Sequence, residues 1–186
     1  RKRTPYAPSD ETNPLNAYGT TKLAGELAAI EANPKTWVVR ASGIYSDHGN
    51  NFALKIIELA QQRESLSVVT DQVGSPCYAP NLAKALWKIL AVQPPIGIYH
   101  FSDFGEVSRC EFAQAIVDEA VAAGIIKKTI PIEGVLSSHF PSPVTRPEYS
   151  VLDASLLKEV ADVSVSEWRP ALQDMIRRVA VRTQSN

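Results

Sequence analysis

Segments with a helical period alternate with short β-rich runs along most of this 186-residue chain. The strand-like runs are rich in Val, Ile and aromatic residues, and they span 36–41, 66–70 and 96–101. Helical spacing of apolar residues predicts helices at about 51–60, 80–90, 109–123 and 166–181, after a first helix that ends near Asn33. Alternation of this kind is typical of parallel strands joined by helical crossovers, so the sequence predicts an α/β fold.

Apolar patterns also predict which faces are buried. The helix at 80–90 carries leucines four residues apart, and the last helix carries an apolar stripe that core packing explains better than a partner groove. The run 36–41 is expected to be a buried strand. We expect the tryptophans to lie in the core or under helices rather than to stack on bases. The leucines of the helix at 80–90 are Leu82, Leu86 and Leu90. The stripe of the last helix is Trp168, Leu172, Ile176 and Val179, and the tryptophans are Trp37, Trp87 and Trp168.

The regular pattern ends after Gly124, where prolines interrupt the sequence. The stretch 140–147 contains three of them and is expected to form a loop. The residues after the last helix, 182–186, are expected to be frayed.

The charge balance argues against a polyanion as partner. Lys and Arg number 19 against 20 Asp and Glu, so the formal charge of -1 does not draw the chain to nucleic acid or to an anionic membrane. No apolar run reaches the roughly 18 residues that span a bilayer, and the first residues lack the apolar core of a signal peptide. We therefore expect a cytoplasmic protein.

The cysteines and histidines show no metal-ligand spacing. Cys77 and Cys110 lie far apart with no Cys-x-x-Cys pair, and His48, His100 and His139 are scattered. We expect two free thiols and no structural metal. Nothing next to Cys77 indicates an activated thiolate.

Tyr18 and Lys22 are four residues apart, so on a helix they share one face and can act on one small volume. An ordinary tyrosine titrates near about 10, and a neighbouring ammonium group stabilises its phenolate. The pair is therefore a candidate acid and base. The alternative is a surface tyrosine beside a solvated lysine, since the spacing is common by chance.

A dinucleotide enzyme needs a glycine-rich turn that places the pyrophosphate at a helix N-terminus. Neither Gly-x-Gly-x-x-Gly nor Gly-x-x-Gly-x-x-Gly occurs among the 9 glycines. The chain also opens on Arg1, with no initiator methionine, in a stretch expected to be a loop. If the Tyr18 pair serves a dinucleotide, the turn is expected upstream of Arg1, and the chain is expected to be a fragment.

Five stretches in one order carry a resemblance to a known family. They are PLNAYGTTKLAGE (14–26), RASGIY (40–45), GNNF (49–52), DQVGSP (71–76) and RPEYSVLD (146–153). Together they resemble the dTDP-4-dehydrorhamnose reductases, which are extended short-chain dehydrogenases/reductases of nucleotide-sugar metabolism. The resemblance implies the C-terminal part of a Rossmann-like fold, with parallel strands, crossover helices and a smaller substrate-binding region. It implies that 1–48 completes the NAD(P)-binding domain, and that 49–186 holds the substrate-binding region and the last Rossmann elements.

Members of that family reduce the 4-keto group of dTDP-4-dehydro-L-rhamnose with NADPH or NADH, which gives dTDP-L-rhamnose for cell-surface polysaccharide. The resemblance implies that Tyr18 donates the proton to the carbonyl oxygen, that Lys22 assists it and holds the nicotinamide ribose, and that Ser42 is a further cofactor contact. Hydride arriving at a carbonyl carbon leaves charge on the oxygen, and a phenol beside a cation stabilises that charge. The chain alone is expected to be inactive, because the glycine-rich turn and the family's upstream Ser or Thr are not in it.

Further substrate contacts are expected in two loops. Asn50 and Asn51 are candidates to reach the sugar nucleotide, with Asn51 equally suited to cap the helix that starts at Phe52. Gln72 and Gly74 are candidates to line the substrate pocket, although turn formation alone explains Gly74.

Two further positions bear on the substrate. Arg146 could offer a bidentate fork to a diphosphate, with a surface salt bridge as the alternative. Gly43 stands where the family commonly has a Trp that packs near the sugar. The absence of that apolar wall affects which sugar binds more than it affects which type of reaction is catalysed.

Two other functions stay open. Gly43 also suits a related reductase or epimerase that acts on another nucleotide sugar. A non-catalytic binding subunit is the second, since a reductase-like protein resembling the regulatory subunit of methionine adenosyltransferase belongs to the same family. The expected partner of the favoured function is a dTDP-sugar, and a homodimer is compatible with the sequence.

Overall fold

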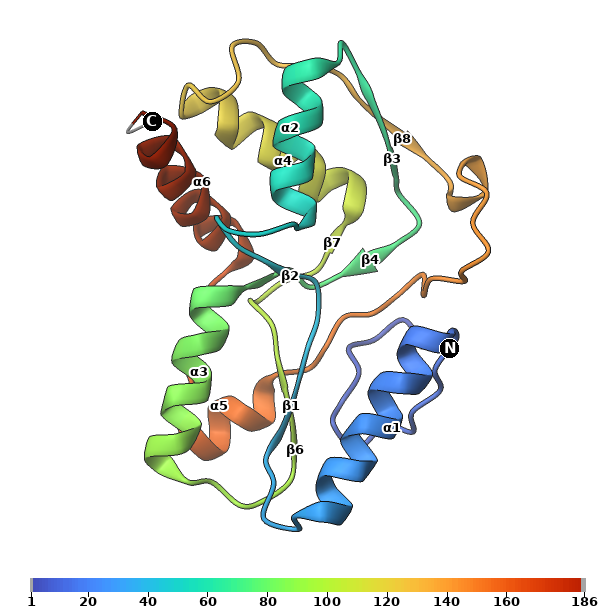
Figure 1. Ribbon diagram of the computed structural model, residues 1–186, viewed down its shortest axis with the longest axis vertical. Coiled ribbons are helices and arrows are strands. Elements are labelled where there is room, and N and C mark those ends of the chain that lie inside the picture. Colours follow the sequence, from blue (N-terminus) through green and yellow to red (C-terminus); the bar gives the residue numbers. More distant parts are fainter. Residues whose placement is uncertain (1, 185–186) are drawn as a thin grey trace.

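The computed structural model of the chain describes residues 2–184. The molecule is elongated, and Figure 1 shows the helices gathered at both ends, with short strands and extended connections between them. The elements are α1 (Ala17–Ala32), β1 (Val38–Ala41), β2 (Ile44–Tyr45), α2 (Phe52–Gln62), β3 (Leu66–Val69), β4 (Val73–Gly74), β5 (Cys77–Tyr78), α3 (Ala79–Val92), β6 (Ile98–Phe101), β7 (Val107–Ser108), α4 (Arg109–Ala122), β8 (Ile132–Val135), a 3-10 turn (Ser137–His139), α5 (Ser155–Ala161) and α6 (Trp168–Gln184).

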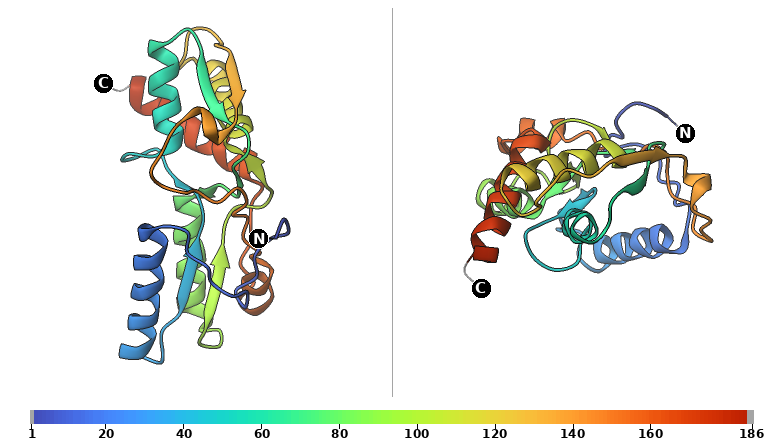
Figure 2. Two further views of the ribbon diagram at one scale, coloured as in Figure 1. Left: turned by 90° about the vertical axis from the view of Figure 1, so that its right-hand side faces the viewer. Right: turned by 90° about the horizontal axis from the view of Figure 1, so that it is seen from above.

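The strands pair two by two. β1 pairs with β6, β2 with β5 and β3 with β8, all in parallel, and β4 pairs with β7 in the antiparallel direction. The register places Val38 opposite Ile98 and Ala41 opposite Phe101. Figure 2 shows α1 on one side of the β1–β6 pair and α5 on the other. The predicted α/β fold with parallel strands is confirmed.

The buried apolar residues form two clusters. The larger lies among α2, β3, α4 and α6 and includes Phe112 and Leu172. The smaller lies among α3, β6 and α5 and includes Phe101 and Leu157. Each end of the molecule therefore has its own core, and the connections between the ends carry most residues of the cleft described below.

A buried carboxylate ties α3 to the end of β6. Asp103, just after β6, accepts hydrogen bonds from the backbone N–H of Tyr78 and from the side-chain amide of Asn81, both at 2.7 Å. Burial raises the pKa of Asp103. Tyr78 is the residue before α3 and Asn81 is the third residue of the helix, so Asp103 attaches the start of α3 to the end of β6.

The buried face of α3 differs from the predicted one. Ala85 and Ile89 are its buried residues, whereas Leu86 and Leu90 are 41% and 53% exposed. Trp87 is 73% exposed, so its assignment to the core is wrong. The reason is that β5 and α5 contact α3 and determine which face is covered, and the sequence pattern indicated neither of them.

The other tryptophans and the last helix agree with the prediction. Trp37 and Trp168 are partly buried against the two clusters, and Leu172 and Ile176 of α6 are buried. The predicted fraying is wrong for 182–184, which belong to α6, and residues 185–186 lie outside the described part of the chain.

Some elements lie outside the predicted pattern. The strand β8 and the helix α5 fall in the proline-rich third of the sequence, and β2, β4, β5 and β7 have two residues each. β1 is half-buried along its length rather than buried. The stretch 140–147 is an exposed segment without helix or strand, as predicted. The expected division near residue 48 stays a prediction.

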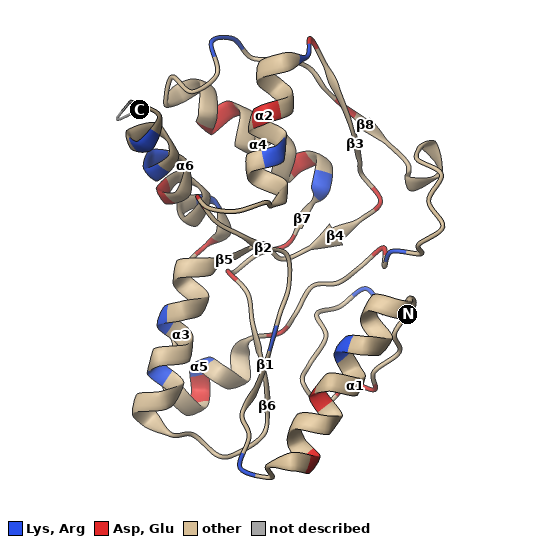
Figure 3. Ribbon diagram, in the orientation of Figure 1, with Lys and Arg blue, Asp and Glu red and all other residues tan. Residues whose placement is uncertain are grey.

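The surface carries both charge signs. Figure 3 shows basic and acidic residues interspersed on α1, α4 and α6. No described helix is long and apolar enough to cross a membrane. Within residues 2–184, no group of three or more His, Cys, Asp or Glu side chains could hold a metal ion. Both cysteines are free, and burial raises the pKa of the Cys77 thiol to about 12.

Candidate active site

A cleft of about 490 Å³ lies where the start of α1, the strands β2 and β4 and the start of α4 come together. Segments far apart in the sequence meet in its walls. Most of the residues that the sequence predicted for the site line it: Tyr18, Ser42, Gly43, Gln72, Gly74 and Arg146.

The cap of α1 places Tyr18 at this cleft. The side-chain oxygen of Asn16 accepts a hydrogen bond from the N–H of Gly19 at 2.9 Å, as an N-cap residue does, and its amino group donates to the carbonyl of Thr145 at 2.9 Å. Tyr18 therefore lies in the first turn, with 74% of its surface exposed. Lys22, one turn further along, is exposed and lies outside the lining of the cleft.

An ion pair between α1 and β1 sets the rotation of the helix that carries Tyr18. Arg40 of β1 donates to Glu26 from Nε at 2.9 Å and from Nη2 at 2.6 Å. This hydrogen-bonded guanidinium lowers the pKa of Glu26. Because α1 has no fully buried residue, the bidentate pair is a principal attachment of this helix. The half-buried residues of α1 share one face of the helix, and Glu26 is the member that bonds β1. They are Gly19, Leu23, Glu26 and Ile30.

The backbone requires a glycine at position 43. Gly43 has φ +48°, and a Cβ on it would lie 3.1 Å from the carbonyl oxygen of Ser75. The neighbouring Ser42 donates from Oγ to the same carbonyl at 3.1 Å. The two chain segments therefore approach closely here, and the cleft has no side-chain wall at this point.

Gly74 also allows a close approach. A Cβ at Gly74 would lie 3.0 Å from Oγ of Ser150, whose N–H bonds the carbonyl of Val73 at 2.9 Å. This contact brings the segment after Arg146 against β4, so packing as well as turn formation explains the glycine.

Asn51 serves as the cap of α2. Its side-chain oxygen accepts from the N–H of Leu54 at 3.2 Å, and its amino group donates to the carbonyls of Ser46 and His48 at 2.9 and 3.0 Å. The capping role is confirmed. The side-chain oxygen and the amino group of Asn51 thus have partners in α2 and in the loop before it, so the geometry gives no support to a ligand-binding role for Asn51.

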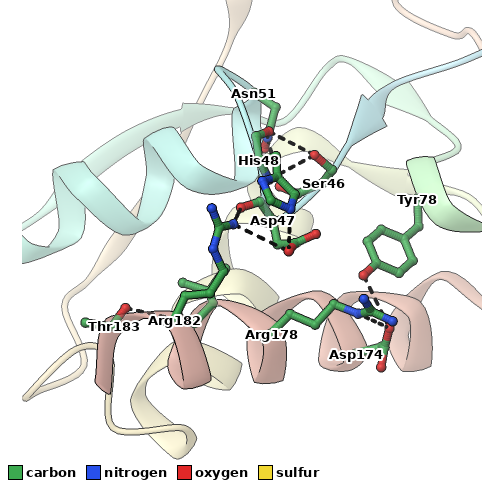
Figure 4. Close-up of polar contacts among 10 residues, drawn as sticks. Ser46, Asp47, His48, Asn51, Tyr78, Asp174, Arg178, Arg182 and Thr183 are labelled. Carbon is green, nitrogen blue, oxygen red and sulfur yellow. Dashed lines mark hydrogen bonds and ion pairs between the residues drawn. The ribbon is translucent and has the colours of Figure 1, made fainter. Parts of the chain in front are cut away.

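The loop that holds Asn50 is attached to α6. Figure 4 shows Asp47 facing Arg182, whose guanidinium donates to the backbone oxygen of Asp47. Asn50 is exposed and, like Asn51, lies outside the lining of the cleft. The substrate roles of the two asparagines stay predictions.

Arg109 lines the cleft and was missed by reasoning from the sequence. It is the first residue of α4, after Ser108, which forms a capping box with Glu111. Nε of Arg109 donates to the side-chain oxygen of Gln72 at 3.0 Å, and its backbone N–H donates to the Gln72 carbonyl at 3.0 Å. The predicted helix at 109–123 does place Arg109 at a helix start, as the structure confirms. Its contact with Gln72 has no sequence signal.

Burial lowers the pKa of Arg109, and the nearby positive charge of Arg146 lowers it further. The ion pairs found among residues 2–184 involve neither arginine. Arg146 itself is exposed, so the surface salt bridge considered for it is not formed. The cleft thus has the exposed phenol of Tyr18 and two guanidinium groups, those of Arg109 and Arg146, in its lining.

The model of the RmlD substrate-binding domain family matches residues 1–181. This chain belongs to that family. The RmlD domain described here is 34% identical over 183 residues to the dTDP-4-dehydrorhamnose reductase of Salmonella typhimurium, which covers 96% of this chain and 61% of that protein. It is 38% identical to the protein of the same name from Mycolicibacterium smegmatis, over 97% of this chain and 54% of that protein.

Solved structures resemble this RmlD domain closely. The dTDP-4-dehydrorhamnose reductase of Clostridium acetobutylicum has a TM-score of 0.88 at 34% identity, covering 96% of this chain and 61% of that chain. The Bacillus anthracis protein of that name, in complex with NADP, has a TM-score of 0.86 at 31% identity. The match covers 94% of this chain and 59% of that chain. The likeness confirms the predicted Rossmann-like fold of extended short-chain dehydrogenases/reductases. This RmlD domain spans less than two thirds of the length of each of these relatives.

Proposed function

We propose that this RmlD domain is the substrate side of a dTDP-4-dehydrorhamnose reductase, an oxidoreductase that reduces the 4-keto group of dTDP-4-dehydro-L-rhamnose with NADPH or NADH. One observation carries the proposal: Tyr18 stands at the mouth of the cleft that Gln72, Gly74 and Arg146 line. A proton donor and the candidate nucleotide-sugar contacts therefore converge on one volume. The names of the relatives support this choice of reaction.

The residues present fit the nicotinamide end of a dinucleotide. Tyr18 and Lys22 stand on one exposed stripe of α1, and Ser42 lies in the adjoining wall. The bound cofactor supplies a hydride. In this proposal the phenol of Tyr18 gives its proton to the substrate oxygen, Lys22 stabilises the phenolate that remains, and Arg146 binds the diphosphate.

The cofactor also needs a dinucleotide-binding half. β1 pairs on one edge only, with β6, within the described part of the chain, and α1 has no fully buried residue. We place that half along the open edge of β1 and against α1. A parallel strand added there would extend the sheet and bring the nicotinamide toward Tyr18.

The test joins this chain to a dinucleotide-binding half and measures NADPH oxidation with dTDP-4-dehydrorhamnose. Tyr18→Phe is expected to lower turnover by roughly 100-fold or more, since it removes the proton donor. Tyr149→Phe is the matched control, because that hydroxyl bonds Glu106 and lies outside the cleft. Full turnover in Tyr18→Phe, or turnover by the chain alone, would contradict the proposal.

Gly43 supports a second candidate, a reductase or epimerase for another nucleotide sugar. The cleft lacks a side-chain wall at this position, so it admits sugars that a bulky residue would exclude. A panel of nucleotide sugars offered to the joined protein separates the two. A folded protein that binds NADPH and turns over none of them would instead be a binding subunit. The cytoplasmic location and the homodimer stay predictions.

A further inference from the structure

Arg109 is held in place before any ligand arrives. Its Nε and its backbone N–H both bond Gln72, and the guanidinium carbon lies 5.3 Å from the centre of the Phe52 ring. The amide of Gln72 is fixed in turn, since its amino group donates to Oγ of Ser137 at 2.9 Å. Arg109 lines the cleft, and within residues 2–184 its two terminal nitrogens form no hydrogen bond or ion pair.

The charge of Arg109 lacks a counterion within residues 2–184. Its neighbours are a neutral amide, an aromatic ring and a second cation, Arg146. A partly desolvated guanidinium beside a like charge is unfavourable unless an anion enters. Since both arginines line one cleft, one ligand can contact both.

We propose that Arg109 is a pre-oriented anion receptor that acts with Arg146, so that the cleft selects ligands with two adjacent phosphates over ligands with one. The inference deepens the proposed function and rests on it for the identity of the nucleotide sugar. A guanidinium presents a planar fork that matches one phosphate group in a bidentate way. Two forks at one cleft match the two phosphates of a nucleoside diphosphate, whereas a monophosphate satisfies only one of them.

The first experiment titrates inorganic pyrophosphate into the 186-residue chain and follows the arginine Nε–H signals by NMR. The signal of Arg109 is expected to shift, and inorganic phosphate is expected to bind at least roughly 10-fold more weakly. The same comparison between thymidine diphosphate and thymidine monophosphate follows. Equal affinity for the one-phosphate and two-phosphate ligands would overturn the proposal.

Variants test the residue directly. Arg109→Gln is expected to weaken pyrophosphate binding by roughly 10-fold or more, because a charge-assisted fork is lost. Arg63→Gln changes the net charge equally on an exposed residue outside the cleft and is expected to bind like the parent chain. Parent-like binding by Arg109→Gln would overturn the proposal.

Gln72→Glu gives a check that keeps Arg109 in the chain. A carboxylate at this position would neutralise the guanidinium, so pyrophosphate binding is expected to weaken as in Arg109→Gln. The double variant, with Arg109→Gln and Gln72→Glu together, is expected to bind pyrophosphate only slightly more weakly than either single variant, since both changes disable the same receptor. If the two single losses of pyrophosphate affinity multiply in the double variant, the proposal is overturned. Circular dichroism verifies that each variant is folded.

The outcomes separate this inference from the proposed function. Binding that depends on Arg109, without reduction of any nucleotide sugar by the joined protein, supports the receptor and overturns the reductase. Reduction of dTDP-4-dehydrorhamnose with the same KM in Arg109→Gln as in the parent supports the reductase and overturns the receptor.

Discussion

Tyr45 forms part of the cleft with a ring that is packed on two sides and a hydroxyl that is not bonded. The ring stacks on Tyr78 at 5.5 Å and meets Phe112 edge-on at 5.4 Å, between ring centres. Within residues 2–184, the buried oxygen of Tyr45 has no hydrogen-bond partner. Burial raises the pKa of this phenol, so the side chain is neutral and serves packing.

Tyr45→Phe is expected to leave the free energy of unfolding unchanged or to raise it by up to about 1 kcal/mol, because it removes an unsatisfied buried group. Tyr78→Phe is the comparison: its hydroxyl donates to Asp174 at 3.3 Å, and losing that bond is expected to cost about 1 kcal/mol. Urea unfolding of both variants measures the difference. A clear loss of stability in Tyr45→Phe would mean that the hydroxyl has a partner in solution.

Residues whose role follows from their own stretch of sequence could be predicted, and residues whose role depends on a distant contact could not. The spacing of Tyr18 and Lys22 and the cap at Asn51 are local, and the structure places the tyrosine and the cap accordingly. Arg109 depends on Gln72, which is 37 positions away in the sequence. Nothing next to Arg109 could have revealed that contact.

The same distinction holds for helices and strands. α4 has a capping box and a helical period, and its predicted bounds agree with the structure to one residue. The paired strands β2 and β5 have two residues each, too few for any period to appear. The face of α3 depends on α5, which lies more than 60 residues further along and whose seven residues gave no distinct pattern.

The attachment of α1 depends on the pair of Glu26 and Arg40. Glu26→Gln is expected to lower the free energy of unfolding by about 2 kcal/mol and to speed hydrogen exchange along α1, because a charge-assisted bidentate contact is lost. Glu31→Gln is the control, since Glu31 is exposed on the same helix. Exchange along α1 that is equal in the two variants would show that the ion pair does not hold the helix.

The pH dependence of the stabilisation by Glu26 follows from the direction in which its pKa is shifted. The folded state lowers the pKa of Glu26 below its usual value of 4.5, so the stabilisation is fully present above that pH. It is lost as the pH falls through the lowered pKa, where the carboxylate takes up a proton. The Glu26→Gln variant should lack this part of the acid transition.

At the scale of the whole molecule, the two ends differ in how well they are covered. The larger cluster has helices on several sides, whereas α1 at the other end exposes Leu27 to 58% and has no fully buried residue. β1 is half-buried and pairs along one edge within the described residues. Local opening is therefore expected to require less free energy at α1 and β1 than at α4.

Joining the chain to a dinucleotide-binding half is expected to slow hydrogen exchange of the β1 and α1 amides by at least roughly 10-fold. The added strand would satisfy the open edge of β1, and the added core would cover α1. The amides of α4 serve as the internal control and should exchange at the same rate in both proteins. Unchanged exchange at β1 would place the added half elsewhere on the molecule.

The backbone at Gly43 also limits how this lineage can change. Its φ of +48° and the carbonyl of Ser75 beside it oppose any side chain, so a single codon change to Trp would strain the chain rather than build an aromatic wall. An aromatic side chain at this position would need compensating changes in both segments at once. Substitutions that change the sugar are therefore expected at the other positions that line the cleft. A mutant library meant to alter specificity should leave Gly43 unchanged.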